Sequence, residues 1–191
     1  MSEQTGIKLL NECKYKEAIE YFSKINTGTS KYCLSFAHFE LNNYKDCLDY
    51  AEESIKMKCK KAYWIVAALY LEGLGVEKDM YTAYKYLELC EDCPQKFIYL
   101  GHFCIMEKHP DDALMCYENA LGYKYKLAEF FIGITYKIME NYDLAKIWFH
   151  SCIEDGVNIL ESKKQIDIIN GKDGVTNCST PEKIEGKDSR L

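Results

Sequence analysis

The residues whose types and spacing best fit chemistry are two cysteines, Cys90 and Cys93, which are followed directly by Pro94. Two cysteines at this spacing can bind zinc or exchange a disulfide. A zinc site needs two further ligands, and the nearest candidates have no recognisable ligand spacing: Cys59, His102 and Cys104. A thioredoxin-like redox site follows a strand, and no strand is predicted here. In a chain with 10 cysteines, the sequence favours a chance pair at a helix end.

No other pattern indicates a catalytic centre. His102 and His109 are seven residues apart, and solvated or core histidines explain them more simply than metal ligands do. The sequence shows no glycine-rich phosphate loop between a strand and a helix, and no spacing typical of a nucleophile with its base. We therefore expect no catalytic residue, no metal site and no cofactor, and the protein is not predicted to be an enzyme.

Most of the other cysteines fall within helical apolar stripes, where alanine or leucine would serve equally well. These positions are Cys33, Cys47, Cys104, Cys116 and Cys152. We expect them to be reduced, buried small residues of an intracellular protein. No basic-then-apolar signal peptide opens the sequence, and no apolar run of about 18 residues could cross a membrane. The triplet that begins at Asn177 fits N-glycosylation, but with no sign of secretion it is discounted.

The composition is that of an ordinary globular protein, with 191 residues, 48% hydrophobic and 28% charged. This length suits one domain with a core of its own. The net charge of −6 disfavours a broad surface for nucleic acid or anionic membrane. A local basic cluster could still touch RNA, although short charge runs usually face water: Lys56, Lys58, Lys60 and Lys61.

The stretch from Tyr70 to Cys90 predicts the end of one helix, a glycine turn and a second helix. Gly73 and Gly75 can adopt the left-handed conformation that helix C-termini often need. Asp79 is well placed to accept backbone N–H bonds at the start of the next helix. Apolar residues with helical spacing flank the turn on both sides: Ala62, Ile65, Val66 and Leu69 before it, and Ala83, Tyr86, Leu87 and Cys90 after it.

The same two-helix unit recurs along the chain. Its second helix carries a small anchor residue at position 18, 47, 83, 113 and 145, so the spacings are 29, 36, 30 and 32. These second helices begin with the segments 15–22, 44–51, 81–87, 110–117 and 142–149. The first helices are predicted near Ser2–Cys13, Ser30–Leu41, Lys60–Leu74, Pro94–Lys108 and Tyr125–Glu140. The period matches one helical hairpin and predicts an all-α solenoid of about five antiparallel helix-turn-helix repeats.

A last amphipathic segment, Val157–Ile169, is predicted to be a capping helix that covers the final repeat. Its predicted apolar side is Ile159, Leu160, Ile166 and Ile169. The predicted repeat domain is 1–169, and 170–191 is predicted to be a flexible tail because it is poor in apolar residues. The final tripeptide, Ser189-Arg190-Leu191, resembles a peroxisomal address and also a PDZ-domain ligand. The expected location is therefore cytoplasmic, with a peroxisomal alternative.

The unit pattern resembles the tetratricopeptide (TPR) repeat, which pairs a small residue in the first helix with alanine and an aromatic residue in the second. The residues that match are Gly6, Ala18 and Phe22 in repeat one, Gly101, Ala113, Tyr117 and Ala120 in repeat four, and Gly133, Tyr136, Ala145 and Phe149 in repeat five. Repeat three is similar to the related Sel-one-like repeat through Tyr70, Gly73, Gly75, Val76, Asp79, Ala83 and Tyr86. Repeat two departs from the pattern at Ser35, Cys47 and Ala51.

This resemblance implies a right-handed superhelix whose first helices line a concave face that binds peptides or helices. The candidate partner-binding residues at its inward positions are Tyr32, Phe36, Phe39, Trp64, Ile98, His102, Phe130 and Ile134. Such an apolar, aromatic surface suits an amphipathic helix or an extended apolar segment of a partner. Two alternatives stay open: the rings pack between adjacent helices as core, or the C-terminal helix or tail fills the groove.

One known TPR function can be tested by position. TPR domains that clamp the acidic tails of heat-shock chaperones use lysine, asparagine and arginine, and the matching positions here are Glu3, Ile7, Trp64 and Ala68. We therefore expect that chaperone-tail peptides do not bind. Titration of such a peptide would show no binding at micromolar concentration, and micromolar affinity would contradict the prediction.

The leading functional hypothesis is a non-enzymatic adaptor or scaffold that holds a protein segment in its groove. The alternative is a stably bound subunit or regulator of a large assembly, such as the ribosome or another ribonucleoprotein, that uses the outer face and the tail. Fold resemblance alone does not decide between them.

Overall fold

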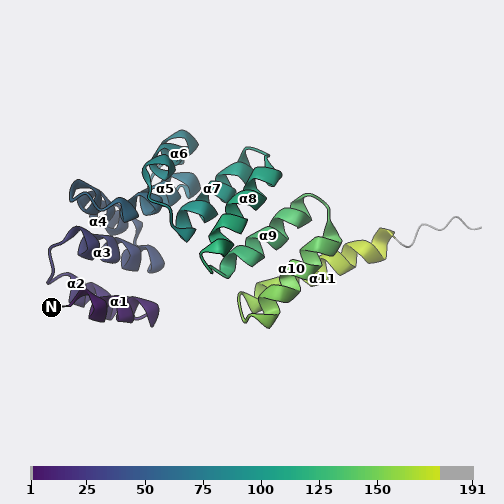
Figure 1. The fold of residues 1–191 in the computed structure, drawn as a ribbon, viewed down its shortest axis with the longest axis horizontal. Helices are drawn as coiled ribbons and strands as arrows, with labels where there is room; N and C mark the ends of the chain where they lie inside the picture. The colour runs from purple at the N-terminus through teal and green to yellow at the C-terminus, as the bar shows by residue number, and fades with distance from the viewer. Residues whose placement is uncertain (1, 177–191) are drawn as a thin grey trace, which may run out of the picture. The chain divides into compact units, whose positions relative to one another are not determined.

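The computed structural model describes residues 2–176, which form helices joined by short turns (Figure 1). The helices are α1 (Glu3–Asn11), α2 (Tyr15–Phe22), α3 (Gly28–Glu40), α4 (Tyr44–Lys56), the short 3-10 helix η1 (Lys60–Ala62), α5 (Tyr63–Glu72), α6 (Met80–Leu89), α7 (Pro94–Met106), α8 (Pro110–Gly122), α9 (Leu127–Ile138), α10 (Tyr142–Glu154) and α11 (Ile159–Thr176). Within the described residues, no helix is long and apolar enough to span a membrane. The all-α repeat architecture predicted from the sequence is confirmed.

The chain divides into two compact units, Met1–Ala128 and Glu129 onward, each considered separately below. In the first unit, consecutive helices pair as α1 with α2, α3 with α4, α5 with α6, and α7 with α8. The first helices of neighbouring pairs also contact one another, α1 with α3, α3 with α5, and α5 with α7. These first helices therefore share one continuous face, which we call the first-helix face.

The anchor residues predicted from the period are core positions of the hairpins. All five are completely buried in their second helices: Ala18, Cys47, Ala83, Ala113 and Ala145. The first helix opposite them carries glycine wherever the second helix carries a large ring. An added Cβ at Gly101 would overlap the ring of Tyr117, and one at Gly133 would lie 2.8 Å from the ring of Phe149. Glycine is needed at these positions because a side chain there would collide with the ring of the facing helix.

Repeat two reaches the same packing with a different residue pair. Ala51 stands where the other repeats have a large side chain, and the larger Ser35 replaces glycine in the facing helix. The hydroxyl of Ser35 donates a 2.8 Å hydrogen bond to the backbone oxygen of Cys47. The side chains of Ser35 and Ala51 are both fully buried. The departure seen in the sequence is therefore a compensated exchange of volume, with the buried hydroxyl satisfied.

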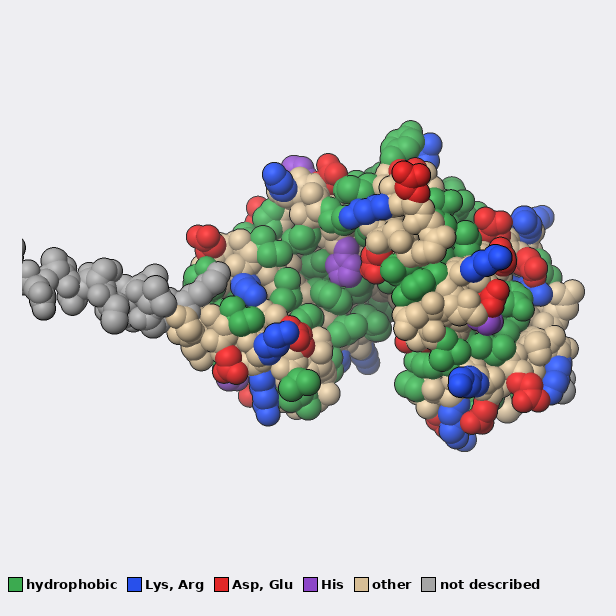
Figure 2. All heavy atoms as spheres, turned by 180° about the vertical axis from the view of Figure 1, so that it is seen from behind, with side chains coloured by type: hydrophobic (Ala, Val, Ile, Leu, Met, Phe, Trp, Pro, Cys, Tyr) green, Lys and Arg blue, Asp and Glu red, His purple; other side chains and the backbone are tan. Residues whose placement is uncertain are grey.

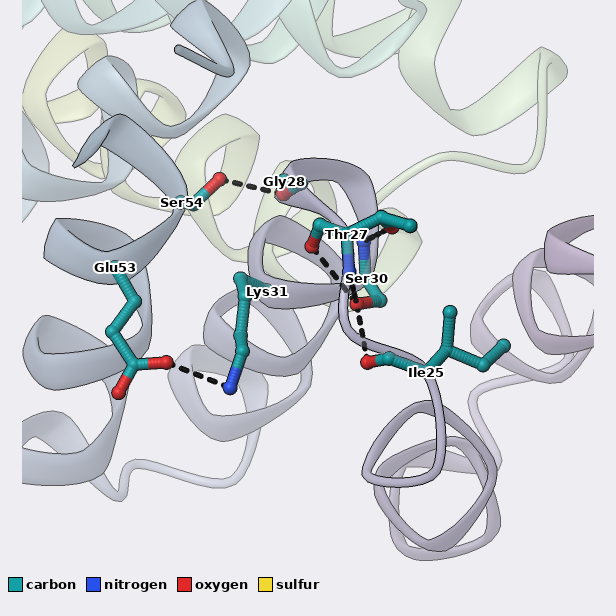
Figure 3. Close-up of polar contacts among 7 residues, drawn as sticks. All are labelled: Ile25, Thr27, Gly28, Ser30, Lys31, Glu53 and Ser54. Atoms are coloured by element: carbon teal, nitrogen blue, oxygen red, sulfur yellow. Dashed lines mark hydrogen bonds and ion pairs between the residues drawn. The ribbon is translucent and has the colours of Figure 1, made fainter. Parts of the chain in front are cut away.

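Polar contacts fix the start of α3, as Figure 3 shows. Thr27 and Ser30 form a capping box, in which each side chain accepts a 3.0 Å hydrogen bond from the backbone N–H of the other. On the facing helix, Ser54 donates to the backbone oxygen of Gly28 at 2.8 Å, and Lys31 pairs with Glu53 at 2.7 Å. These contacts fix the first turn of α3 against α4. The helix begins at Gly28, two residues earlier than the sequence predicted.

The glycine turn between α5 and α6 has the predicted geometry. Gly73 and Gly75 have φ values of +74° and +72°. The carboxylate of Asp79 accepts hydrogen bonds from the backbone N–H groups of Tyr81 and Thr82, both at 3.0 Å. This turn thus ends one helix and begins the next as expected.

Other helices end on a left-handed residue that is not glycine, and three of these are lysines: Lys58, Lys108 and Lys124, with φ between 61° and 65°. The left-handed conformation costs an L-residue about 1–2 kcal/mol, and glycine avoids this cost.

We therefore expect Lys108→Gly to raise the free energy of unfolding by about 0.5–1 kcal/mol, despite the greater flexibility of glycine in the unfolded chain. Urea unfolding measures this change. Lys108→Ala is the control, since it removes the same side chain but keeps the strain. Equal stability of the two variants would contradict the explanation.

The C-terminal helix corrects one prediction. Ile169 is fully buried as expected, but Leu160 is 83% exposed and Ile159 is 41% exposed. The buried side of α11 instead includes the polar residues Ser162 and Gln165. The helix continues to Thr176, beyond the position where the tail was predicted to begin. The final tripeptide and the glycosylation triplet lie outside the described residues.

Candidate functional site

Aromatic rings run across the first-helix face from α3 to α7. Trp64 of α5 lies at the centre, with its ring 6.1 Å from Phe36 and 5.9 Å from Phe39 of α3. On its other side it stacks on Tyr99 of α7 at 5.9 Å, and Tyr99 contacts the His102 ring at 5.5 Å. We call these five residues the aromatic row. It joins three consecutive repeats, so a ligand lying on it would span all three.

The members of the row are buried to different degrees. Trp64 is only 3% exposed, whereas Phe36, Phe39, Tyr99 and His102 are half-buried. The tryptophan therefore belongs to the core beneath the surface, and the other four rings are partly accessible to solvent. Burial lowers the pKa of His102 to about 4, so its imidazole is neutral at pH 7.

The other sequence-predicted site residues have different surroundings. Tyr32 is half-buried near Trp64, and Ile98 is almost fully buried in α7. In the second unit, Phe130 packs against Phe149 of α10 with ring centroids 5.8 Å apart, while Ile134 is half-buried. The structure thus brings together the residues from repeats two to four. Phe130 also serves the core of the second unit.

Two carboxylates that the sequence analysis missed lie beside the aromatic row. Glu40 is the last residue of α3 and Glu72 the last residue of α5. After burial, which is the main cause, nearby Glu72 and Glu40 both raise the pKa of Tyr99. The hydroxyl of Tyr15 donates to a Glu40 carboxylate oxygen at 3.2 Å. Both carboxylates also sit at the negative ends of helix dipoles, so this part of the surface favours a cation.

Burial raises the pKa of Glu72 itself, although the residue is exposed to solvent. The carboxylate is therefore reached by water while protein surrounds much of it. In the sequence, the two carboxylates were indicated only by an acidic residue close to the turn that follows each first helix. This indication is weak alone, because many helices end on a charged residue.

The basic cluster lies at the connection between α4 and α5. Its four lysines are all exposed, and Lys56 pairs with Glu52 at 3.8 Å. On the face drawn in Figure 2, acidic and basic side chains are interspersed among apolar ones. Within residues 2–176 no group of three or more histidine, cysteine, aspartate or glutamate side chains is arranged to hold a metal ion.

The chaperone-clamp positions show no basic surface. The carboxylate of Glu3 accepts a hydrogen bond from the Thr27 hydroxyl, while Trp64 and Ala68 are buried. Ile7 is exposed but apolar. That chaperone tails do not bind stays a prediction, which the peptide titration described above tests.

Comparison with solved structures identifies the fold. Eight solved chains match. A chain of the APC/C hetero-tetramer Cut9–Hcn1 aligns with a TM-score of 0.76 and 17% identity, covering 88% of this chain and 36% of that one. A Sel1 repeat protein from Oxalobacter formigenes aligns with a TM-score of 0.59 and 17% identity, covering 81% and 70%. No protein-family model and no curated protein matches the chain.

These likenesses show the TPR and Sel1-like helical-repeat fold that the sequence pattern predicted. The chain spans about a third of the length of the Cut9–Hcn1 chain that it matches.

Proposed function

We propose that this protein is a non-enzymatic interaction scaffold whose first-helix face binds a segment of a partner protein. The observation that carries the proposal is the aromatic row, which extends across three first helices and has four half-buried rings that solvent can still reach. Rigid aromatic side chains are efficient anchors, because they bury a large area for little loss of side-chain freedom. The fold shared with TPR and Sel1-like proteins is consistent with this role.

The charges beside the row indicate the chemistry of the partner segment. Glu40 and Glu72 favour a lysine or arginine, and the half-buried rings favour aromatic or aliphatic side chains. An amphipathic helix or an extended segment with both kinds of residue would fit. The net charge of −6 adds long-range attraction for a basic partner.

The test combines affinity purification with charge reversal. The protein carries an N-terminal tag, and bound proteins are identified by mass spectrometry with and without ribonuclease. We expect one or two stoichiometric proteins that survive ribonuclease and are lost from the variant Glu40→Lys/Glu72→Lys. The control, Glu88→Lys/Glu118→Lys, makes the same charge change at exposed positions on second helices.

Two outcomes would contradict the proposal. Equal capture by the two charge-reversal variants would show that the first-helix face is not used. A large set of proteins lost on ribonuclease treatment would instead favour a ribonucleoprotein subunit, with binding through other surfaces.

A further inference from the structure

The two cysteines separated by two residues lie at the connection between α6 and α7. Cys90 directly follows α6 as its C-cap and is only 5% exposed, whereas Cys93 directly precedes α7 as its N-cap and is half-buried. The Cys93 sulfur accepts a 3.5 Å hydrogen bond from the backbone N–H of Lys96. Pro94 occupies the first position of α7. Cys93 is therefore a helix N-cap through its sulfur, in contact with free backbone N–H groups.

The side chains of Cys90 and Cys93 interact with each other, and this interaction changes the pKa of both thiols. The interaction is the main reason why the pKa of Cys93 is lowered, with smaller contributions from the backbone N–H groups of Gln95 and Lys96 and from the Lys96 ammonium group. The same interaction, together with burial, raises the pKa of Cys90. The lysine is held in place, since its ammonium group donates to the Cys90 backbone oxygen at 3.1 Å. One thiol is thus prepared for ionisation and its neighbour stays protonated.

Cys93 also opens into a pocket of about 220 Å³. The lining residues are Tyr32, Lys61, Trp64, Glu91, Asp92, Cys93 and Gln95. Cys90 is not among the lining residues and is only 5% exposed. A small molecule in the pocket would therefore meet Cys93 rather than Cys90.

We propose that Cys93 and Cys90 form a redox-reactive dithiol that exchanges with low-molecular-weight disulfides. In the first step the Cys93 thiolate attacks a disulfide RSSR, forming a mixed disulfide and releasing RS⁻. In the second step Cys90 loses its proton and attacks the Cys93 sulfur, which releases the second RS⁻. The two cysteines are oxidised to one disulfide, and RSSR is reduced to two thiols once two protons are returned.

A second pair of thiols in the same unit provides an internal control. The side chains of Cys104 and Cys116 also interact with each other, but they lie on the facing helices α7 and α8. Burial raises the pKa of both thiols, that of Cys116 to about 12. These cysteines lack a helix N-terminus and are expected to react slowly.

The experiment uses the full chain in a Cys13→Ser background, which removes an exposed thiol. The reduced protein is mixed with oxidised glutathione, and cysteine peptides are followed by mass spectrometry. We expect the peptide containing Cys90 and Cys93 to lose two hydrogens. Cys90→Ser should accumulate one glutathionyl group on Cys93, and Cys93→Ser should leave Cys90 unmodified. Cys93 should react at least about tenfold faster than Cys104 or Cys116, because a larger fraction of Cys93 is in the thiolate form.

Two results would overturn the proposal. One is a Cys93 reaction no faster than that of the second pair. The other is a stable glutathionyl adduct on the protein that retains Cys90, which would show that Cys90 does not resolve it. Circular dichroism of each variant confirms that the helices are retained, so that a slow reaction is not mistaken for a misfolded protein.

Discussion

Replacing Trp64 with alanine is expected to lower the free energy of unfolding by about 3–5 kcal/mol, a value typical of a large aromatic residue truncated in a core. The indole is 3% exposed and contacts Phe36, Phe39 and Tyr99. Its removal leaves a cavity between three helices and takes away three ring contacts, each worth about 0.5–1.5 kcal/mol beyond burial. Urea unfolding followed by circular dichroism measures the loss.

The control for this prediction is Trp64→Phe, which keeps a ring at the centre of the row. It should lose less stability than the alanine variant. If Trp64→Ala unfolds at the same urea concentration as the wild type, the indole does not hold the three helices together. Any loss of partner binding by Trp64→Ala has to be interpreted together with its helicity, whereas Glu40 and Glu72 test binding at exposed positions.

The second large effect is expected from Gly101→Ala. The added methyl group would overlap the ring of Tyr117, so the helices of repeat four must separate or the ring must leave its rotamer. Overpacking of this kind costs about 1–3 kcal/mol. The greater helix propensity of alanine offsets part of this, by about 0.5–1 kcal/mol. We expect a net loss of about 1–2 kcal/mol, measured as a lower urea midpoint with an unchanged slope.

Two further variants make the cause of that loss specific. Gly122→Ala is the matched control, because a methyl group there meets nothing within 4 Å, and it should be neutral or stabilising. Gly101→Ala/Tyr117→Leu introduces the residue types that repeat three has at the corresponding buried positions, Ala67 in α5 and Leu87 in α6. The double variant should be more stable than the sum of the single changes predicts. Additive losses would show that the clash is not the reason.

The sequence was sufficient for the repeat architecture, because the packing of each hairpin depends on a few small residues at a fixed spacing. Ala18, Ala83 and Ala113 could be recognised without a structure, and all are fully buried. Repeat two was harder, since the Ser35 and Ala51 pair makes sense only when the two helices are seen against each other. The volume of one residue explains the identity of the other.

The C-terminal helix shows the limit of periodicity. Its apolar residues Ile159 and Leu160 suggested one face, but the neighbouring helix α10 determines which face is covered. The polar residues Ser162 and Gln165 are buried there instead. A terminal helix packs on one side only, so several orientations satisfy the same local pattern. Contact with a neighbour, rather than the pattern, selects among them.

The candidate site was predictable in part. The aromatic side chains could be found from their offset to the small residue of each first helix, but their differing burial could not. The carboxylates of Glu40 and Glu72 gained meaning only when Tyr99 was placed near both. For the cysteine pair, the sequence already predicted a helix that begins at Pro94, directly after Cys93. The hydrogen bond that the Cys93 sulfur accepts from the backbone N–H of Lys96 could not be predicted from it.

The positions of the tryptophans have a practical consequence for spectroscopy. The chain contains 2 tryptophans, and each compact unit holds one: Trp64 in the first and Trp148, which is half-buried, in the second. Intrinsic fluorescence therefore reports on both units at once, and replacing either indole with phenylalanine isolates the signal of the other. The protein carries two optical probes that can show, without any added label, whether its halves melt together or one after the other.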